Sequence, residues 1–508
     1  MDDPTTYIGA VGGPSLTLGD AAEYAERTQV GEMDYEIEKE LYEYACELIG
    51  IGQEEADRSF DRMIDFEARI AEHTLTQEEM MGADAIENLD QYVTIDELDR
   101  MLGEGYDLRA ELEDNGFLPE RITIQMPEQI EFIGELLSDE SNLEDLKNWM
   151  KVHCLLGSAP DLSKEALIHA DRIVQELTGT QDSIEYETML LYQVADDLDD
   201  FMQRAYVERY ASPEMKEQIT DLCEDIIAEY RQMLLGEDWL SQETRNKAVE
   251  KLDALTINAV YPDKWEDCSG LDVVGMNYYE AFQAIRTFYL RQTCSEVNQK
   301  VDPEIWQNDP LEVNAYYNPV NNSINILLGA LGGQIYTTDM SREEVYGRIG
   351  AIIGHEISHA FDSSGSQFDK DGNMVDWWTK KDSAAFEKRI EKVRAFYDRI
   401  AIYGEQYLVG TKLDGEATAD IAGLGCMLRL AEKEEDFDYD AMFRSYAKFW
   451  CGKQTPYLME YLNIYDSHPP MYLRCNVTLQ QFDKFLETYD IREGDGMYLA
   501  PEDRIAVW

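Results

Sequence analysis

The chain is short of positive charge. It carries 43 Lys and Arg against 104 Asp and Glu, which gives a formal net charge of −61 and an isoelectric point of about 4.2. A negative field of this size repels nucleic-acid phosphate and anionic lipid, so neither is expected as a partner. Attraction of cationic peptides is one interpretation of the acidity, and a solvated acidic surface is the simpler one.

Long apolar runs are also missing. No stretch approaches the roughly 18 apolar residues of a membrane-spanning helix, so we expect no membrane segment in this chain. The opening MDDPTTYIGAVGGPSLTLGD has neither a basic nor an apolar region, so no signal peptide is evident. The eight cysteines form no C-x-x-C pair, which argues against a zinc ribbon. The oligomeric state stays open.

What the chain does have is length and helical periodicity. Its 508 residues suffice for two or three domain-sized units. Over residues 20–255 apolar side chains recur at three- and four-residue spacing among acids, as in 34–50, 54–73 and 213–236. This pattern is typical of amphipathic helices. No fixed-period repeat and no Ser/Gly-rich linker interrupts it.

A β-like pattern follows in residues 256–265 and 314–331, where Asn-Pro and Asn-Asn pairs indicate a turn between two strands. Helices resume near Ser341, which has with Glu344 the spacing of a capping box. We therefore expect a mainly α, two-lobed protein. The helical lobe would cover residues 1–240 and an α+β lobe residues 241–508.

Histidine is scarce, with six in the chain, yet two lie four residues apart in IIGHEISHAFD (352–362). Residues at this spacing share one face of a helix, so His355 and His359 can bind the same cation. Glu356 then lies beside the metal and can take a proton from a metal-bound water. The alternative is a pair of polar histidines on a solvated helix face.

A catalytic zinc needs a third protein ligand and an open position. In KLDGEATADIAGLGCMLRLAEK (412–433), Glu416 and Asp420 are four apart at the start of a second helix. Glu416 is a candidate ligand, and Asp420 can accept the free N–H of a ligating histidine. Asp362, one turn past His359, is a second candidate for that orienting role. The Gly/Ala-rich sequence favours close packing of this helix on another. The alternative for Glu416 and Asp420 is a solvated helix face.

Five segments together resemble the neprilysin-like zinc peptidases, the M13 family. They are GHEISHAFD, GEATAD, VNAYYNP (313–319), DWW (376–378) and SHPPMYLR (467–474). Their order agrees with that family, as does the separation of 57 residues between His359 and Glu416. PDKW (262–265), VDPEIW (301–306) and the terminal DRIAVW extend the resemblance over nearly the whole chain. It implies a zincin-like catalytic lobe with an H-E-x-x-H helix and one Zn2+ per chain.

The resemblance also implies residue roles. The zinc ligands would be His355, His359 and Glu416, and the catalytic residues Glu356, Asp420 and His468. Asp420 would be a proton donor, Asp362 would orient a histidine, and His468 would stabilise the oxyanion. Arg474 would bind a substrate carbonyl, and Asn314 with Ala315 would pair with the substrate backbone. Alone, a His before Pro-Pro is more often a loop residue and NAYY more often a plain strand.

The implied activity is zinc-dependent endoproteolysis. The enzyme would hydrolyse oligopeptides on the amino side of hydrophobic residues, by attack of a zinc-bound water assisted by Glu356. Zinc lowers the pKa of its bound water toward about 7, which makes hydroxide available at neutral pH. Ile352 and Ile353 are candidates to shape the apolar pocket; plain core packing is the alternative. Peptide substrates are the expected partners.

The chain departs from the family pattern at both ends. Ile505 replaces the near-terminal Cys, so the disulfide of animal members is not expected. Family members usually carry a further N-terminal segment, often with a signal or anchor, so we expect a truncated chain or a reduced lobe. If this sequence leaves out an N-terminal segment, we expect a secreted or cell-surface protein. If the protein has no such segment, we expect a cytoplasmic one.

Two other classes of function compete with the peptidase. A zinc-bound peptide-binding or scaffold protein without activity would have no need of Glu356. A helical interaction protein with incidental histidines would require all five segments to coincide by chance.

Overall fold

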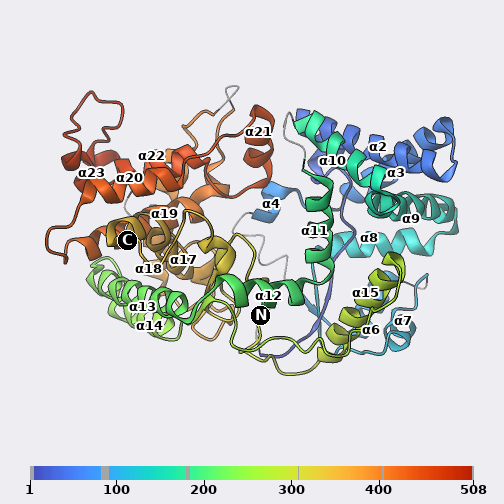
Figure 1. The fold of residues 1–508 in the computed structure, drawn as a ribbon, viewed down its shortest axis with the longest axis horizontal. Helices are drawn as coiled ribbons and strands as arrows, with labels where there is room; N and C mark the ends of the chain where they lie inside the picture. The colour runs from blue at the N-terminus through green and yellow to red at the C-terminus, as the bar shows by residue number, and fades with distance from the viewer. Residues whose placement is uncertain are drawn as a thin grey trace.

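The computed structural model describes residues 5–81, 91–103, 105–178, 184–306, 308–402 and 406–505. It is mainly helical and consists of two groups of helices side by side (Figure 1). We call the helices between residues 22 and 197, with residues 278–296, the first lobe. The second lobe contains residues 213–260 and 314–505. The predicted fold class, mainly α and two-lobed, is confirmed.

The predicted helices of the first lobe are present. The bounds of its elements are α1 (Ala22–Ala25), α2 (Gln29–Ile49), α3 (Gln53–Ala71), α4 (Gln77–Met81), α6 (Ile95–Leu102), α7 (Leu108–Asp114), α8 (Pro127–Ser138), α9 (Leu143–Ser158), α10 (Lys164–Thr178), α11 (Tyr186–Asp197) and α15 (Tyr278–Glu296). Phe60, Met63 and Val152 are fully buried where α2, α3 and α9 meet. Helix α11 ends before Leu198, and α12 (Asp199–Tyr210) runs from there toward the second lobe (Figure 1).

The first lobe also contains a small sheet that the sequence did not predict. Strand β3 (Ile122–Ile124) lies between β1 (Gly9–Val11), which is parallel to it, and β2 (Gln91–Val93), which is antiparallel. Each strand has three residues, too few for apolar alternation to stand out from the surrounding helical pattern. The buried Ile122 and Ile124 pack against the apolar faces of α6 and α8.

The second lobe holds the other sheet. Helices α13 (Pro213–Gly236) and α14 (Gln242–Asp253) precede β4 (Thr256–Val260). Strand β6 (Ser323–Leu327) lies between β4, parallel to it, and β5 (Ala315–Asn318), antiparallel to it. The turn from β5 to β6 passes through Asn322 with a φ of 48°. Both predicted strands and their turn are confirmed, and β5 is the edge strand.

The capping box predicted at the start of the H-E-x-x-H helix is present, since Ser341 and Glu344 cap each other. The segment is less regular than the sequence suggested. After α16 (Arg342–Val345) one π-helical turn covers Tyr346–Gly350, α17 (Ala351–Ser358) follows, and the chain tightens to a 3-10 turn at His359–Phe361. The second histidine therefore lies at the C-terminal end of α17.

Helix α19 (Gly410–Ala431) starts earlier than predicted, so Glu416 lies well inside it. Glycines let α19 cross α17 closely: a Cβ on Gly423 would lie 2.5 Å from the carbonyl oxygen of Ala351, and one on Gly354 2.9 Å from the Cα of Gly423. The close packing predicted from the Gly/Ala-rich sequence is confirmed. The other helices of this lobe are α18 (Lys380–Tyr397), α20 (Tyr439–Phe449), α21 (Pro456–Tyr465), α22 (Met471–Gln480) and α23 (Asp483–Thr488).

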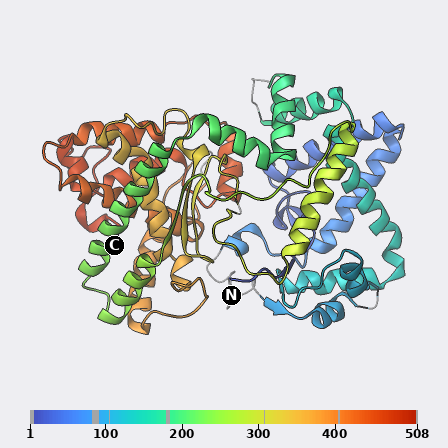
Figure 2. The same ribbon diagram turned by 60° about the horizontal axis from the view of Figure 1, so that its bottom comes forward.

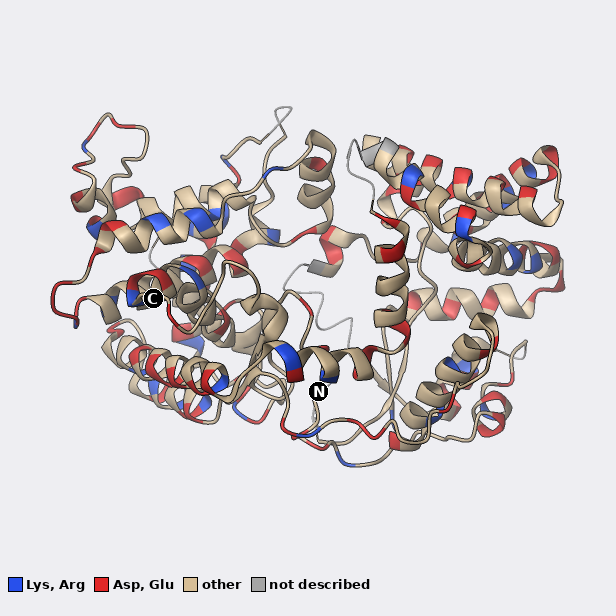
Figure 3. Cartoon of the chain, in the orientation of Figure 1, with Lys and Arg blue, Asp and Glu red and all other residues tan. Residues whose placement is uncertain are grey.

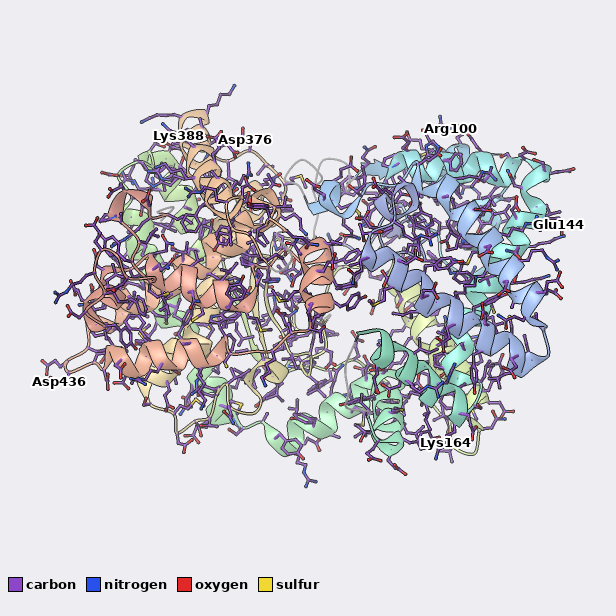
Figure 4. All side chains as sticks on the ribbon, turned by 90° about the horizontal axis from the view of Figure 1, so that it is seen from above. Arg100, Glu144, Lys164, Asp376, Lys388 and Asp436 are labelled. Atoms are coloured by element: carbon purple, nitrogen blue, oxygen red, sulfur yellow. The ribbon has the colours of Figure 1, made fainter. Side chains whose placement is uncertain are left out.

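The order of the helices along the chain differs from their arrangement in the two lobes. Helix α15 lies with the first lobe although it follows α13 and α14, which pack in the second (Figures 1 and 2). Tyr230 of α13 belongs to the same apolar core as α17 and α19. The division of the sequence into residues 1–240 and 241–508 stays a proposal. In Figure 4, Arg100, Glu144 and Lys164 label the outer surface of the first lobe, and Asp376, Lys388 and Asp436 that of the second.

Asp and Glu are distributed over both lobes (Figure 3). Ile505, which stands where the resembled family has Cys, is buried among apolar side chains of α18 and α22; Ala506–Trp508 lie outside the described residues. Among the described helices, none combines the length and apolarity that crossing a membrane requires.

Candidate metal centre

The two histidines of α17 and its C-terminal end converge. His355 is 3% exposed, and its Nε2 lies 3.0 Å from Nε2 of His359. The other nitrogen of each ring, Nδ1, faces a carboxylate. Nδ1 of His355 lies 2.9 Å from Oδ1 of Asp420, and Nδ1 of His359 lies 2.6 Å from Oδ2 of Asp362. Both Nε2 atoms are thereby aimed at one point.

Glu416 comes to the same point from α19. Its Oε2 lies 3.0 Å from Nε2 of His355 and 3.6 Å from Nε2 of His359. Burial opposes ionisation of Glu416, but the charge of a protonated His359 and the closeness of the His355 and His468 rings outweigh it and hold the pKa of this carboxyl well below its usual range. The structure thus brings all three predicted zinc ligands together.

Asp362 lies in a loop whose hydrogen bonding the sequence did not predict. Its Oδ1 accepts the backbone N–H groups of Ser364 and Gly365, which fixes the carboxylate that faces His359. Lys251 of α14, 1% exposed, holds the same loop: its ammonium donates to the carbonyl oxygens of Ala360, Gly365 and Phe368 at 2.9, 2.7 and 2.6 Å. The sequence offered no signal for Lys251, because its partners are more than 100 residues away.

Asp420 joins His355 to Arg474. The Arg474 guanidinium donates from Nε to Oδ2 of Asp420 at 2.8 Å and from Nη2 to Oδ1 at 2.6 Å. Burial opposes the charge on Asp420, and Arg474 and His355 outweigh it, so the pKa of Asp420 is lowered. Arg474 also lies over the ring of Trp450, 4.1 Å from its centroid. The predicted substrate-binding arginine is therefore committed in part to a ligand-orienting carboxylate.

Glu356 lies beside the cluster of ring nitrogens and the Glu416 carboxylate. Its Oε1 is 4.0 Å from Nε2 of His355, and the residue is 5% exposed. Burial raises the pKa of Glu356, although the nearby histidines oppose the rise. A carboxyl group with a raised pKa holds a proton more readily, as a group that must accept and release protons requires.

His468 reaches the site from the loop after α21. Its Nε2 lies 3.1 Å from Oε2 of Glu416, and its Nδ1 lies 2.6 Å from Oδ1 of Asp466. Burial opposes protonation, but Asp466 and Glu416 raise the pKa of His468 to about 9. Sequence reasoning missed Asp466; its signal is the D-S-H spacing, which lets the carboxylate accept both the ring N–H and the backbone N–H of His468.

The cluster opens into a cavity of about 500 Å3. Asn314 and Ala315, at the start of edge strand β5, line it together with Met80 of the first lobe. Asn314 is exposed, and its amide donates to Oε1 of Glu312 at 3.0 Å. All predicted site residues except Asp420 and Arg474 line this cavity, and those two lie directly behind His355.

The predicted pocket residues lie elsewhere. Ile353 is fully buried in the core of the second lobe and Ile352 is half-buried against it. The core-packing alternative therefore describes Ile353. A second cavity of about 180 Å3 adjoins His468 and Arg474, and its apolar lining comes from Leu408, Leu413, Trp450, Met459 and Leu462.

The donor set fits a zinc ion. Oε2 of Glu416 is buried, and no group among the described residues makes a well-oriented hydrogen bond to it, although three ring nitrogens lie within 3.6 Å. When the rings of His355 and His359 donate from Nδ1, their Nε2 atoms and Oε2 of Glu416 are three acceptors that face one another, which is an arrangement a cation satisfies. Two imidazoles and one carboxylate are a common protein set for catalytic zinc, and carboxylate partners on the far ring nitrogens are typical of such sites.

An H-E-x-x-H helix whose histidines converge with a carboxylate from a second helix defines a zinc metallopeptidase. Comparison with known proteins gives the family. Residues 1–262 and 314–505 match models of peptidase family M13. The chain belongs to that family.

Relatives agree with the assignment. The chain is 31% identical over 503 residues to a neutral endopeptidase of Lactobacillus helveticus, covering 98% of this chain and 76% of that protein. It is 28% identical over 415 residues to human neprilysin, covering 77% of this chain and 54% of that protein. Enzymes with these names are zinc metalloendopeptidases, and by family this chain is one too.

Solved structures show the same fold. A crystal structure of zinc metalloprotease ZMP1 of Mycobacterium tuberculosis in complex with an inhibitor has a TM-score of 0.90 at 25% identity, covering 100% of this chain and 79% of that one. The open state of the same protein has a TM-score of 0.71 at 25% identity, covering 100% and 81%.

Proposed function

We propose that the chain hydrolyses oligopeptides internally, on the amino side of hydrophobic residues, with one Zn2+ per chain held by His355, His359 and Glu416. The observation that carries the proposal is the convergence of three donor atoms beside Glu356. Nε2 of His355 lies 3.0 Å from both Nε2 of His359 and Oε2 of Glu416, and 4.0 Å from Oε1 of Glu356.

Bound zinc would supply a Lewis acid that lowers the pKa of a water molecule and polarises the scissile carbonyl. The protein's own residues do the rest. Glu356 takes the proton of the attacking water, because its buried carboxylate lies 4.0 Å from Nε2 of His355 and, unlike Asp362 and Asp420, does not face Nδ1 of a ligand. It then delivers that proton to the leaving amine, which its raised pKa favours. Asp362 and Asp420 hold the tautomers and orientations of His359 and His355.

His468 is placed to stabilise the oxyanion. Its Nδ1–H donates to Asp466, so a second N–H on Nε2, facing the site, requires the imidazolium form. A cationic donor forms a stronger hydrogen bond than a neutral one. Asp420, committed to His355 and Arg474, serves His355 more directly than it serves the leaving group.

Substrate binding would use the edge of the sheet and Arg474. The free edge of β5, beginning at Asn314 and Ala315, can pair with an extended peptide backbone. Within the described residues Nη1 of Arg474 has no hydrogen bond, whereas Nε and Nη2 bind Asp420, so Nη1 remains to donate to a substrate carbonyl.

The preference for a hydrophobic residue after the cut rests on the second cavity. Its volume of about 180 Å3 suits one side chain, and Leu413, Trp450 and Met459 contribute apolar walls beside His468 and Arg474. A side chain seated there leaves water at a gain of about 25 cal/mol per Å2 of apolar surface. The inactive zinc-binding scaffold is the weaker candidate, because it gives Glu356 no role.

The proposal is tested with peptides blocked at both ends that differ only in the residue after the cut. We expect no cleavage after chelation of the metal, full recovery with one equivalent of zinc, and a kcat/KM at least tenfold higher for Leu or Phe than for Gly or Asp. Cleavage that survives complete metal removal would overturn the metal site. Equal cleavage of all peptides would overturn the assigned preference.

A further inference from the structure

Helix α21 belongs to the second lobe but touches the first. It lies beside α2 in two views, and it also contacts α4 (Figures 1 and 4). Tyr457, Tyr461 and Tyr465 recur every four residues and therefore share one face of the helix. Tyr457 hydrogen-bonds to Asp34 of α2, and the hydroxyl of Tyr465 donates to the carbonyl oxygen of Leu18 at 3.5 Å. The tyrosine face is thus the contact surface between α21 and the first lobe.

This helix is weakly held by its own lobe. None of its residues is fully buried, whereas α17 and α19 contribute many buried residues to the second lobe. Elements with few buried contacts are the ones whose position responds to small changes in free energy. Contacts at the two ends of α21 therefore matter more than they would for a core helix.

Lys412 holds the C-terminal end. Its ammonium donates to the carbonyl oxygens of Asn463 and Ile464 at 2.7 and 2.6 Å, and the residue is 8% exposed. The last carbonyls of a helix lack partners within the helix and carry its negative dipole end, so a lysine there both satisfies and stabilises them. Lys412 is one turn before Glu416 on α19, which ties the end of α21 to the helix of a zinc ligand.

The held end leads straight to the site. Asp466 and His468 follow α21 directly, and Asp466 fixes the ring and backbone of His468. Only three residues lie between Ile464, which Lys412 binds, and His468, whose Nε2 lies 3.1 Å from Oε2 of Glu416. A shift of α21 relative to α19 must therefore move the imidazole relative to the ligands.

We propose that α21 couples the contact between the two lobes to the position of His468. Docking of α2 on the tyrosine face, with Lys412 as the fixed end, holds His468 over the metal ligands. When the first lobe withdraws, α21 loses this support and His468 loses its place. The inference rests on the proposed function, in which His468 stabilises the oxyanion.

ZMP1 of Mycobacterium tuberculosis has been solved both in complex with an inhibitor and in an open state. This chain superposes on the inhibitor complex of ZMP1 with a TM-score of 0.90 and on the open state of the same protein with 0.71. The structure described here, with α21 docked on α2, is the one closer to the inhibitor complex.

The test truncates the tyrosine face and determines whether the resulting change in kcat depends on His468. The double variant Tyr457→Ala/Tyr461→Ala is compared with Leu458→Ala, an exposed residue on another face of α21, in wild-type and His468→Ala backgrounds. We expect at least a tenfold lower kcat for the double variant, unchanged zinc content, and no effect of Leu458→Ala. In the His468→Ala background the tyrosine truncation should change kcat less than twofold, because the residue it acts through is gone.

An equal loss of kcat in both backgrounds, or none in either, would overturn the proposal. Lys412→Met should reproduce the double variant, and Lys412→Arg should recover most of the activity. A readout independent of turnover is the imidazole 15N signal of His468 in zinc-loaded, histidine-labelled protein, assigned by its loss in His468→Ala. We expect that signal to shift on tyrosine truncation. If the wild type cleaves no peptide, the proposed function fails, and an unshifted signal then overturns the coupling separately.

Discussion

His355 and His359 point their Nε2 atoms at each other across 3.0 Å, while the Nδ1 of each faces a carboxylate. When both rings are neutral and donate from Nδ1, each carries a lone pair on Nε2, and two lone pairs at this distance repel. A cation between them, completed by Glu416, converts that repulsion into binding. The account of this protein as a zinc peptidase rests on that relationship.

Replacing Glu416 by Ala removes the carboxylate that completes the ligand set. We expect zinc affinity to fall by at least about 100-fold, because two imidazoles alone leave the cation short of its usual three protein ligands. Competition with a chromogenic chelator measures this loss. Glu432→Ala, past the end of the same helix, is the control and should bind zinc as the wild type does. Unchanged affinity in Glu416→Ala would mean that another residue is the third ligand.

Asp362→Asn keeps the size of the side chain but removes the charge that holds His359. Because Oδ2 of Asp362 lies 2.6 Å from Nδ1 of His359, we expect zinc affinity to fall about 10- to 100-fold. The exposed Asp371→Asn in the following turn serves as the control. The same competition assay applies, and equal affinities for both variants would show that Asp362 does not orient His359.

Gly423→Ala tests the crossing of α17 and α19. The added Cβ would lie 2.5 Å from the carbonyl oxygen of Ala351 and 2.6 Å from the amide nitrogen of His355, so the helices must separate. We expect a loss of about 3 kcal/mol in the free energy of unfolding and weaker zinc binding. Gly425→Ala on the same helix meets the ring of Phe482 at 3.3 Å, which can move aside. Equal stability of the two variants in denaturant titrations would contradict the close packing.

Asp34 gives the contact between α2 and α21 a pH dependence. Burial, and next the charge of Glu23, raise the pKa of Asp34 from its ordinary 3.8 to about 6, although the hydrogen bond from Tyr457 opposes the rise. Tyr461, Tyr465 and Glu38 also face it. An acid whose pKa is raised in the folded state ionises first in the unfolded state, so its penalty on folding begins above pH 3.8, grows until pH reaches about 6, and stays constant above that.

Asp34→Asn abolishes that penalty while its amide oxygen still accepts from Tyr457. Because the carboxyl is only half-buried, we expect the variant to gain about 1 kcal/mol over the wild type between pH 5 and pH 7.5. Denaturant titrations at pH 5, 6 and 7.5 measure the difference. A difference that does not change with pH would show that Asp34 ionises near its ordinary pKa.

Much of the site was predictable because it depends on the spacing of residues that are close together in the sequence. His355, Glu356 and His359 needed only a helix, and the structure supplies one. The sequence also indicated the pairing of β5 with β6 and the close helix crossing through Gly423. These features depend on a few neighbouring residues whose pattern is unambiguous.

The rest depends on contacts between distant segments. Lys251 binds carbonyls more than 100 residues further along the chain, and Lys412 binds the end of α21 about 50 residues away. Main-chain acceptors leave no trace in the sequence, so neither lysine could be assigned a role. The sequence did not predict the three-residue strands of the first lobe or the π-helical turn before α17, because the apolar spacing around them is that of helices.

The most direct test of the central claim is Glu356→Gln, measured for zinc content and peptide cleavage together. The ligands remain and the base is lost, so the account predicts about one zinc per chain and a kcat lower by about 1000-fold or more. Glu343→Gln, half-buried in the first turn of α16, should match the wild type in both measurements. A zinc-loaded Glu356→Gln enzyme that cleaves peptides at the wild-type rate would contradict the account.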